Sequence, residues 1–207
     1  MISSARRSTA RVLTTMTHVR PLRPLGELGM RLLFNQVAGR WDAIRSDPAY
    51  LDSLRAALDE LPTRRGVAAE PAAALDVACG TGLATQVLVE RFTRARVRGI
   101  DIAPSMVELA RKAVPDATFV VGSALELPFD DGEFDLVVAL DGVFSTRELS
   151  RVTARGGAIV IVYSRGGSIP VRRGVEELAA AFAADGLETA SRTGESWVVW
   201  AWRPRPD

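Results

Sequence analysis

The sequence has 207 residues but contains only one cysteine, one histidine and one lysine. A single cysteine cannot form an intramolecular disulfide, and one cysteine with one histidine cannot build a Cys/His zinc centre. The histidine, His18, stands near the N-terminus, which argues against a Ser-His-Asp triad in the core. No apolar run reaches about 18 residues, the length that a membrane-spanning helix requires. We therefore expect a soluble, cytoplasmic protein with no metal site and no membrane span.

The overall composition is that of a globular protein, whereas the N-terminal segment differs from the rest. Hydrophobic residues make up 47% and charged residues 25% of the chain, and a net charge of +1 gives no reason to expect a nucleic-acid partner. Residues 1–26, in contrast, contain five arginines and no acidic residue. We predict a flexible basic tail over this segment; the alternatives are a targeting peptide and a nucleic-acid-binding arm.

From residue 27 onward, two kinds of hydrophobic pattern follow each other. Apolar residues recur every three or four positions between residues 27 and 61, which predicts two helices, and a Pro-, Arg- and Gly-rich loop follows over 62–71. Beyond the loop, short apolar runs alternate with helical stretches. Strands are predicted over residues 74–78, 97–100, 118–121, 135–140 and 158–163, and helices over 83–92, 105–114 and 146–153.

This alternation predicts a parallel sheet with helices on both faces, because parallel strands need crossover connections. A helix over 173–184, capped by Gly186, and two apolar runs over 187–192 and 196–202 complete the chain. Only residues 193–195 connect the two runs, so we predict that they pair antiparallel. The fold class is therefore a single α/β domain over residues 27–207, with a doubly wound sheet.

The segment LDVACGTG, residues 75–82, carries the strongest functional signal. An apolar strand ends there in a glycine-rich turn that begins a helix. Gly80 and Gly82 have no Cβ, so the backbone can approach a ligand closely, and the positive end of the helix faces the same crevice. Asp101 ends the next strand, where its carboxylate can accept hydrogen bonds from both hydroxyls of a ribose. The two features together predict a nucleoside-containing cofactor.

A nicotinamide dinucleotide is the first alternative for this cofactor. The turn matches the G-x-G-x-x-G pattern only in part, because Thr85 stands at the third glycine position. The carboxylate of Asp76 would repel a pyrophosphate, whereas it would attract an ammonium group. Lys112, the only lysine, has no tyrosine at the Tyr-x-x-x-Lys spacing that hydride transfer often uses. These observations favour a cationic nucleoside ligand.

Five motifs in order resemble those of the class I S-adenosylmethionine-dependent methyltransferases. They are FNQVAGRWD (34–42), LDVACGTG (75–82), GIDIAPSMVELARKA (99–113), VVGSALELPFDDGEFDLVVA (120–139) and ELSRVTARGGAIVIV (148–162). The resemblance implies a seven-stranded Rossmann-like core over residues 71–207 under a helical lid over 27–70. It also implies methyl transfer from S-adenosylmethionine to a small-molecule substrate, with S-adenosylhomocysteine as the product.

The resemblance further implies a cofactor-binding position for each matching residue. Asp76 would lie near the methionine end of the cofactor, whose carboxypropyl chain would follow the backbone of Ala78, Gly80 and Gly82. Asp101 would bind the ribose, with Ile102 and Met106 against the adenine ring. Ser123, Ala124 and Leu125 would meet the adenine edge, while Ala139 and Leu140 would form the floor below the sulfonium.

Two of these positions depart from the commonest family pattern. Ala78 stands where a glycine is usual, which is harmless provided that Ala78 keeps a negative φ. Ser123 stands where many relatives carry Asp, and a hydroxyl accepts a hydrogen bond from the adenine amino group less strongly than a carboxylate does. We therefore expect weaker cofactor binding than an aspartate at position 123 would give.

Asp141 is the candidate general base, since it follows the fourth strand and a hydroxyl or amine acceptor must lose a proton. The alternative is a role as a helix cap or turn residue. Glu148, Tyr163 and Arg165 are weaker candidates for holding the acceptor. Cys79 fits a small buried hydrophobic residue better than a nucleophile, because no histidine can activate it.

Two other functions stay open at this point. The chain can be a methyltransferase-like protein that binds the cofactor without catalysis, or an RNA methyltransferase that uses the basic tail. Nucleic acid is the less favoured substrate, because the Asn-Pro-Pro-Tyr signature of amino-methyltransferases is absent after the fourth strand. The sequence does not specify the methyl acceptor or the oligomeric state.

Overall fold

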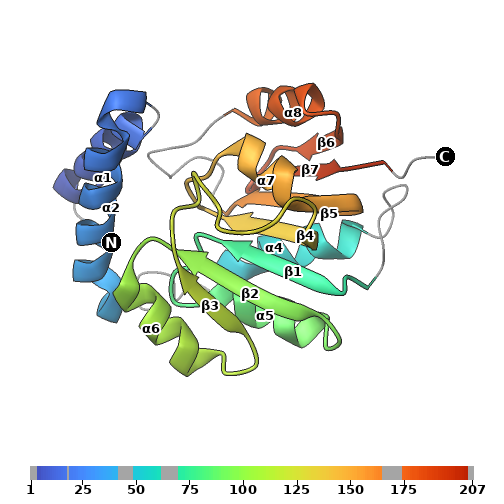
Figure 1. Ribbon diagram of the computed structural model, residues 1–207, viewed down its shortest axis with the longest axis horizontal. Coiled ribbons are helices and arrows are strands. Elements are labelled where there is room, and N and C mark those ends of the chain that lie inside the picture. The colour runs from blue at the N-terminus through green and yellow to red at the C-terminus, as the bar shows by residue number, and fades with distance from the viewer. Residues whose placement is uncertain (1–3, 18, 42–48, 62–69, 165–173, 205–207) are drawn as a thin grey trace.

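A computed structural model describes residues 4–17, 19–41, 49–61, 70–164 and 174–204 (Figure 1). Its centre is a seven-stranded sheet in the order β3-β2-β1-β4-β5-β7-β6. The strands are β1 (Ala73–Val77), β2 (Arg96–Asp101), β3 (Thr118–Val121), β4 (Phe134–Leu140), β5 (Thr153–Tyr163), β6 (Glu188–Arg192) and β7 (Trp197–Trp202). Strands β1 to β5 pair in parallel, and β7 is antiparallel to both of its neighbours. The predicted doubly wound sheet with an antiparallel last strand is confirmed.

The strand order reverses between β1 and β4. The chain runs outward from β1 through β2 to β3, and then returns to the centre of the sheet to form β4 on the other side of β1. In open α/β sheets, ligands bind outside the carboxyl ends of the strands at such a reversal. Asp76, Asp101 and Asp141 lie at or next to the carboxyl ends of β1, β2 and β4.

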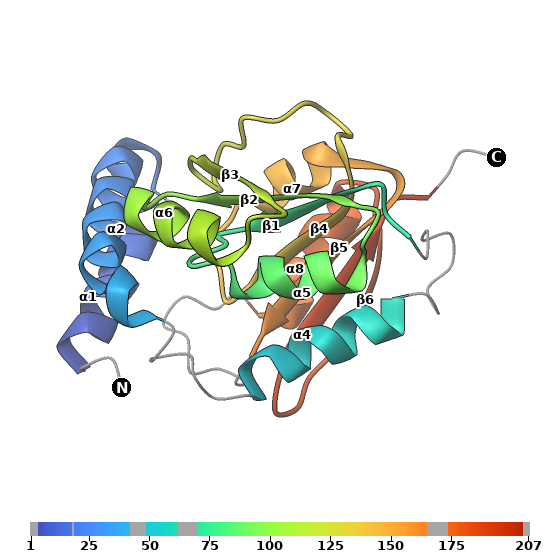
Figure 2. The same cartoon turned by 90° about the horizontal axis from the view of Figure 1, so that it is seen from below.

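Helices cover both faces of the sheet. In Figure 2, α4 (Ala49–Glu60) and α5 (Leu83–Arg91) lie on one face, and α7 (Thr146–Val152) lies on the other. Each face of the sheet packs against its helices in a hydrophobic core, and successive residues of β1 point to opposite faces. Leu75 packs in the core that contains side chains of α7 and α8 (Val175–Ala184), whereas Ala74 packs in the core that contains side chains of α4 and α5. The helix α6 (Pro104–Ala113) covers β2 and β3. Strands that are buried on both faces explain the continuous apolar runs in the sequence.

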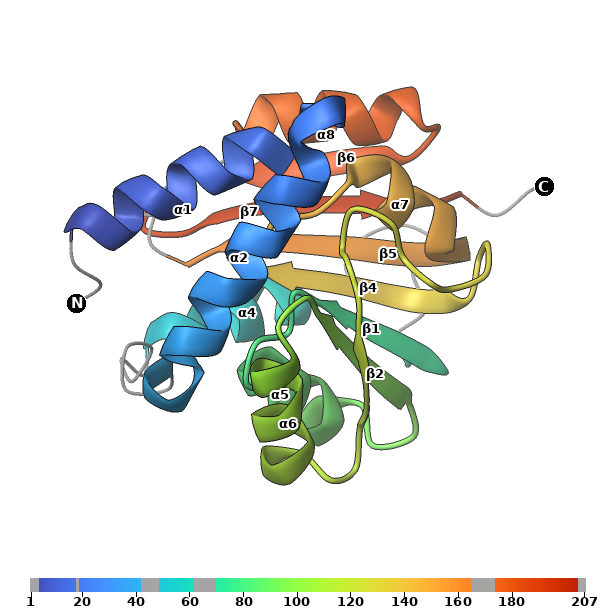
Figure 3. The ribbon, with the colours of Figure 1, turned by 60° about the vertical axis from the view of Figure 1, so that its left-hand side comes forward.

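A helical hairpin stands at the carboxyl-end edge of the sheet. It consists of α1 (Ser4–Thr17), a short 3₁₀ turn η1 (Arg20–Leu22), and α2 (Arg23–Val37), which is followed by a second 3₁₀ turn η2 (Ala38–Arg40). Figures 1 and 3 show α2 running across the ends of the parallel strands. The two helices pack closely because Gly26 carries no side chain, since a Cβ there would lie 2.8 Å from the carbonyl oxygen of Leu13.

The hairpin differs from the flexible basic tail that the sequence suggests for residues 1–26. Ser4–Thr17 is a helix in the structure, and α2 begins at Arg23, before the expected start of the domain. The physical reason is that Thr14 and Thr17 are buried against α2, where the Thr14 hydroxyl contacts the sulfur of Met30. Charge composition alone does not reveal this packing, because α1 is short of apolar residues.

The other predicted elements lie within a few residues of the observed ones. β3 has the predicted bounds, and Gly186 ends α8 with a φ of +81°, as a C-terminal cap requires. The predicted start of the last helix, Arg173, lies outside the described residues. Within the described parts of the chain, we find no helix that is long and apolar enough to cross a membrane.

Candidate functional site

The turn that follows β1 has left-handed backbone at three of its five positions. Ala78, Gly80 and Gly82 have φ values of +58°, +55° and +92°. The condition under which Ala78 would be harmless, a negative φ, is therefore not met. The turn must redirect the chain from β1 into α5 within five residues, and Gly142 leaves space for the Ala78 Cβ, because a Cβ at Gly142 would lie 2.9 Å from it. An alanine in this conformation costs about 1–2 kcal/mol relative to its ordinary backbone.

Asp76 is a buried carboxylate inside β1, with only 1% of its surface exposed. Its Oδ2 accepts a hydrogen bond of 2.6 Å from the hydroxyl of Thr85 on α5, and the Thr85 N–H also donates to it. The pKa of Asp76 is raised from 3.8 to about 7, mainly by burial and also by the charge of Asp101, against the opposing effect of the Thr85 hydrogen bonds. Thr85, which breaks the G-x-G-x-x-G pattern, is thus the partner of this carboxylate.

Asp101 ends β2 and ties that strand to the glycine-rich turn. Its Oδ2 accepts the N–H of Gly80 at 2.9 Å, and its Oδ1 accepts the N–H of Ala103 at 2.9 Å. Burial raises the pKa of Asp101, while the backbone donors at Ala103, Gly80 and Ile102 lower it. Each carboxylate oxygen has two acceptor positions, so these contacts leave capacity for the two hydroxyls of a ribose.

The two carboxylates lie close enough to interact, and no arginine or lysine in the described ranges forms an ion pair with either of them. A buried carboxylate is costly unless a cation or several hydrogen bonds compensate it. A ligand that carries an ammonium group and a ribose would supply what both lack. The residues at the ends of β1 and β2 therefore fit a cationic nucleoside such as S-adenosylmethionine.

The end of α2 and the residues after it cover this site. A Cβ at Gly80 would lie 3.2 Å from the indole nitrogen of Trp41, so the Trp41 ring lies directly over the turn. Phe34 contacts Trp41 edge to face, with ring centroids 5.5 Å apart. Met106, which the resemblance places against the adenine, is 1% exposed and packs with Val37 and its neighbour Ala38.

A second contact joins α2 to the start of α6. The side-chain oxygen of Asn35 accepts hydrogen bonds from the backbone N–H of Ser105 at 3.1 Å and from its hydroxyl at 2.6 Å. The Ser105 N–H is one of the backbone donors that the first turn of a helix leaves without an intrahelical partner. The sequence does not reveal Asn35 as a capping residue, because Asn35 lies on another helix, 70 positions away.

Ser123 follows β3 and contacts Glu27, a second residue whose role the sequence alone does not reveal. Its hydroxyl donates to Glu27 Oε1 of α2 at 2.8 Å, and its oxygen accepts the N–H of Leu125 at 3.1 Å. Ala124 and Leu125 are partly exposed beside it. The structure thus brings the predicted adenine-edge residues next to the end of β2, since Val121 pairs with Asp101.

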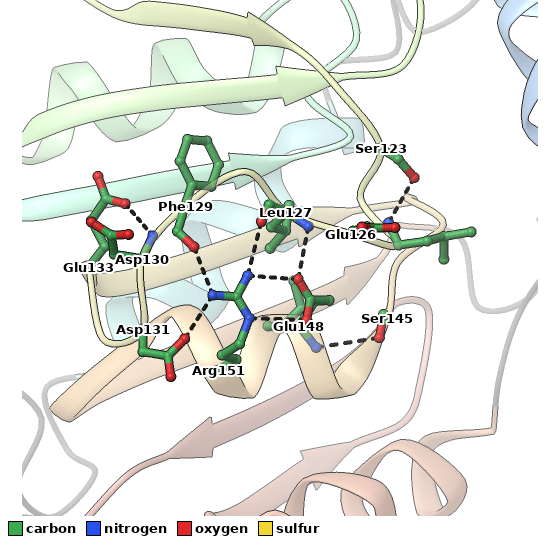
Figure 4. A network of polar contacts seen from close by, with 12 residues as sticks. Ser123, Glu126, Leu127, Phe129, Asp130, Asp131, Glu133, Ser145, Glu148 and Arg151 are labelled. Atoms are coloured by element: carbon green, nitrogen blue, oxygen red, sulfur yellow. Dashed lines mark hydrogen bonds and ion pairs between the residues drawn. The ribbon is translucent and has the colours of Figure 1, made fainter.

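The loop between Ser123 and β4 is fixed by Arg151 of α7 (Figure 4). The guanidinium donates to the carbonyl oxygens of Leu127 at 2.9 Å and Phe129 at 2.7 Å, and it pairs with Glu148 at 2.7 Å and Asp131 at 2.9 Å. The hydrogen bond from Arg151 lowers the pKa of Glu148, whose other role is to accept the N–H of Leu127. Glu148 therefore supports the loop rather than facing a crevice as an acceptor-binding residue.

The end of β4 contributes a buried floor and one carboxylate. Ala139 is fully buried, and Leu140 is 6% exposed. Asp141 follows them with a φ of +55°, and both of its carboxylate oxygens accept hydrogen bonds from Ser164, at 2.9 Å from the backbone N–H and 2.7 Å from the hydroxyl. These bonds fix the orientation of the carboxylate at the carboxyl ends of β4 and β5.

Cys79 is a packing residue, as the sequence suggests. Its side chain belongs to a cluster with Val107, Ala110 and Phe119 under α6, and burial raises the pKa of the thiol. Tyr163 is buried within β5, and Arg165 lies outside the described residues.

Comparison with known proteins relates the part of the chain that carries this site to methyltransferases. The sequence profile of a family described as "Methyltransferase domain" matches residues 74–157. The chain is 34% identical over 148 residues to a demethylmenaquinone methyltransferase of Thermus thermophilus, in a match that covers 63% of each chain. Residues 74–157 of this chain are therefore similar to a methyltransferase domain. The chain spans less than two thirds of the length of such curated relatives, with 43% of one from Thermotoga maritima.

Solved structures of methyltransferases share the fold. A chain in the complex of the Haloferax volcanii Trm112 methyltransferase activator with a methyltransferase has a TM-score of 0.69 at 20% identity, covering 83% of this chain and 98% of that one. Magnesium protoporphyrin IX methyltransferase from Synechocystis, solved with bound SAH, has a TM-score of 0.63 at 18% identity, covering 86% and 99%. The methyltransferase match at 74–157 contains Asp76, Asp101 and Ser123 but not the α2 residues that cover them.

Proposed function

We propose that this protein transfers a methyl group from S-adenosylmethionine to a small-molecule acceptor. The observation that carries the proposal is the pair of buried carboxylates, Asp76 and Asp101, which interact at the ends of β1 and β2 with no described cation as partner. This pair fits the ammonium and ribose of one ligand. The match of residues 74–157 to a methyltransferase domain supports S-adenosylmethionine as that ligand.

When bound, S-adenosylmethionine supplies an activated methyl group on a sulfonium, so the protein needs mainly to align the reactants and exclude water. Asp76 attracts the ammonium at the methionine end, and Asp101 holds the ribose while it fixes Gly80. Trp41 lies over the turn and keeps water from it; an aromatic ring is also a favourable neighbour for a cation. The remaining cofactor-binding residues predicted from the family pattern keep their assigned positions in this proposal.

Asp141 is the candidate general base of the proposed reaction. Its carboxylate lies at the end of β4, oriented by the two hydrogen bonds from Ser164. A base of this kind removes the proton of a hydroxyl or amine acceptor as the methyl group transfers. An Asp141→Asn variant with lower kcat and unchanged cofactor affinity would support this role, whereas a loss of stability with unchanged kcat would assign Asp141 to the β4–β5 connection.

A small molecule is the acceptor class that the observations favour. The overall net charge of +1 and the absence of an Asn-Pro-Pro-Tyr signature after β4 do not favour a nucleic-acid acceptor. The Thermus relative is named for demethylmenaquinone, so this compound is the first acceptor to test.

Calorimetry with S-adenosylhomocysteine tests the cofactor site directly. We expect binding to the wild-type protein and at least about tenfold weaker binding to Asp101→Asn, because a ribose hydroxyl loses a charged acceptor. Asp116→Asn, the same change on an exposed side chain, is the matched control. The absence of S-adenosylhomocysteine binding to the wild-type protein would refute the proposal. Transfer of a labelled methyl group to demethylmenaquinone then tests catalysis.

A further inference from the structure

Glu27 reaches from α2 to the loop that follows β3. Its Oε1 accepts hydrogen bonds from the Ser123 hydroxyl at 2.8 Å and from Arg23 Nε at 2.9 Å. Glu27 and Ser123 are 96 residues apart in the chain, so helix α2 brings this carboxylate to the loop from outside the methyltransferase match at 74–157. Arg23 also pairs with Glu126 at 3.2 Å, which anchors the same end of α2.

Beside the loop that follows β3, the side chain with an oxygen still able to accept a hydrogen bond is that of Glu27 rather than that of Ser123. The single hydroxyl proton of Ser123 is already donated to Glu27, and its oxygen already accepts the N–H of Leu125. The side chain of Glu27 is 23% exposed, and its Oε2 receives no hydrogen bond from any residue in the described ranges. A partly buried carboxylate oxygen in this state favours a ligand N–H.

The topology places that oxygen where the base of a bound nucleoside would lie. Asp101 and Val121 are paired in register on neighbouring strands, about 4.8 Å apart. Ser123 follows Val121 by two residues, and the Gly122 N–H donates to the carbonyl oxygen of Asp101. A base attached to a ribose at Asp101 therefore extends over Ser123 and towards Glu27.

We propose that the Glu27 carboxylate accepts a hydrogen bond from the exocyclic amino group of the cofactor's adenine, so that helix α2 selects a 6-aminopurine base. This inference rests on the proposed function, because it takes Asp101 as the ribose-binding residue. A 6-oxopurine in the same position would present an acceptor oxygen to the carboxylate. The 6-oxopurine would make no hydrogen bond with the Glu27 carboxylate and would place two acceptor oxygens together, so it should bind less tightly than the 6-aminopurine.

The test compares S-adenosylhomocysteine with S-inosylhomocysteine, its 6-oxo analogue, by calorimetry. We expect the wild-type protein to prefer the amino compound by about 10- to 100-fold. In Glu27→Gln this preference should fall to within about threefold, because the amide N–H₂ can donate to the oxo group. Glu126→Gln, which removes the exposed carboxylate on the same arginine, is the control and should keep the wild-type ratio.

The possible results are distinguishable. Equal affinity of the wild-type protein for the two compounds overturns the proposal without any variant, as does a Glu27→Gln protein that still discriminates like the wild type. If Glu27→Gln does not fold, Glu27→Asp provides the variant measurement, with a shortened carboxylate and an expected loss of most of the discrimination. Failure of the wild-type protein to bind either compound refutes the proposed function instead.

A different observation concerns the outer face of the hairpin. Seven large hydrophobic residues in the described ranges are exposed, and six of them lie between residues 12 and 32. Leu25, Leu28 and Leu32 follow the i, i+3, i+7 spacing of one helix face and are 58%, 44% and 54% exposed. None of the exposed described residues between 9 and 32 is acidic, since Glu27 is directed at Ser123.

Charge decides which partner fits this face. Residues 1–26 carry five arginines and no acidic residue, and Arg31 is exposed beside Leu28 and Leu32. An apolar helix face with basic neighbours is the pattern of segments that lie in the interface of an anionic bilayer. We infer that the hairpin docks on an anionic lipid surface through Leu25, Leu28 and Leu32.

Sedimentation with lipid vesicles tests this second inference. The full chain should bind vesicles that contain phosphatidylglycerol and should bind phosphatidylcholine vesicles at least about tenfold less, with binding that weakens as salt rises. Replacing the three leucines with serine should remove the binding. Because these side chains are exposed, the triple variant should keep its cofactor affinity, which also reports on its folding. Binding that the variant retains, or a wild-type dimer in light scattering that the variant abolishes, would overturn the inference.

Discussion

Replacing Asp76 with asparagine should stabilise the free protein at neutral pH. Asp76 lies fully buried in β1, and burial raises its pKa from 3.8 to about 7. When folding raises the pKa of a carboxyl group, that group stabilises the folded protein at pH values below its pKa in the unfolded chain. This stabilisation is lost as the pH rises to the higher pKa of the folded state. In the wild-type protein this loss therefore falls between about pH 4 and pH 7. Asparagine carries no charge, and its amide oxygen can still accept the hydrogen bond from Thr85.

The size of the effect follows from the shift in pKa. A shift of about three units, at about 1.4 kcal/mol per unit, makes the charged carboxylate about 4 kcal/mol less favourable in the folded protein. Asp76→Asn should thus match the wild-type free energy of unfolding near about pH 4. It should gain about 1.4 kcal/mol per pH unit up to about pH 7, and level off above that.

Urea denaturation of both proteins across this pH range measures the difference. Asp116→Asn controls for the loss of one negative charge from the chain as a whole, because Asp116 is exposed. The same variant should bind S-adenosylhomocysteine more weakly at about pH 8, since the ligand's ammonium loses its carboxylate partner. A stability difference that does not change with pH, or a variant that is less stable than the wild type at about pH 8, would refute the reasoning.

Three further predictions address the loops around the site. Ala78→Gly should raise the free energy of unfolding by up to about 1 kcal/mol in a chemical denaturation experiment, because glycine tolerates the φ of +58° but adds chain entropy to the unfolded state. Arg151→Ala should lower stability by about 2 kcal/mol and expose residues 122–132 to limited proteolysis, since two backbone carbonyls and Glu148 lose their donor. The Cys79 thiol should react with an alkylating reagent on the order of 100-fold more slowly in the native than in the unfolded protein, as mass spectrometry can follow.

The parallel core could be predicted because each of its elements has a local signal. An apolar run such as residues 118–121 between a helix and a turn has few alternatives to a strand, and β3 has these bounds. Asp101 was identifiable for a similar reason, since its distance from the glycine-rich turn follows from one βαβ unit. The antiparallel end of the sheet followed from the three-residue connection at 193–195.

The resemblance implied a helical lid over residues 27–70, but the contacts that the lid makes with the site could not be predicted in the same way. Asn35 caps α6, Glu27 contacts Ser123, and Trp41 lies over Gly80, although each pair is far apart in the sequence. Such contacts depend on where the N-terminal hairpin docks, and no spacing rule connects a helix to a loop about 100 residues away. The basic composition of residues 1–26 also pointed away from the helix that α1 forms.

Several features that lower the stability of the free protein lie together at the turn between β1 and α5. Their presence at one place is evidence for a ligand-binding site there. Asp76 and Asp101 are buried next to each other without a described cation, and Ala78 has a left-handed backbone between them in the chain order. Each feature lowers the stability of the free protein, and each can be removed by a single conservative substitution. Features of this kind persist where they serve binding, because a cationic ligand reverses the cost of the carboxylates. The contacts of Asn35, Glu27 and Trp41 stabilise the same region from α2 and the residue after η2, so the hairpin supports the strained turn at the proposed cofactor site.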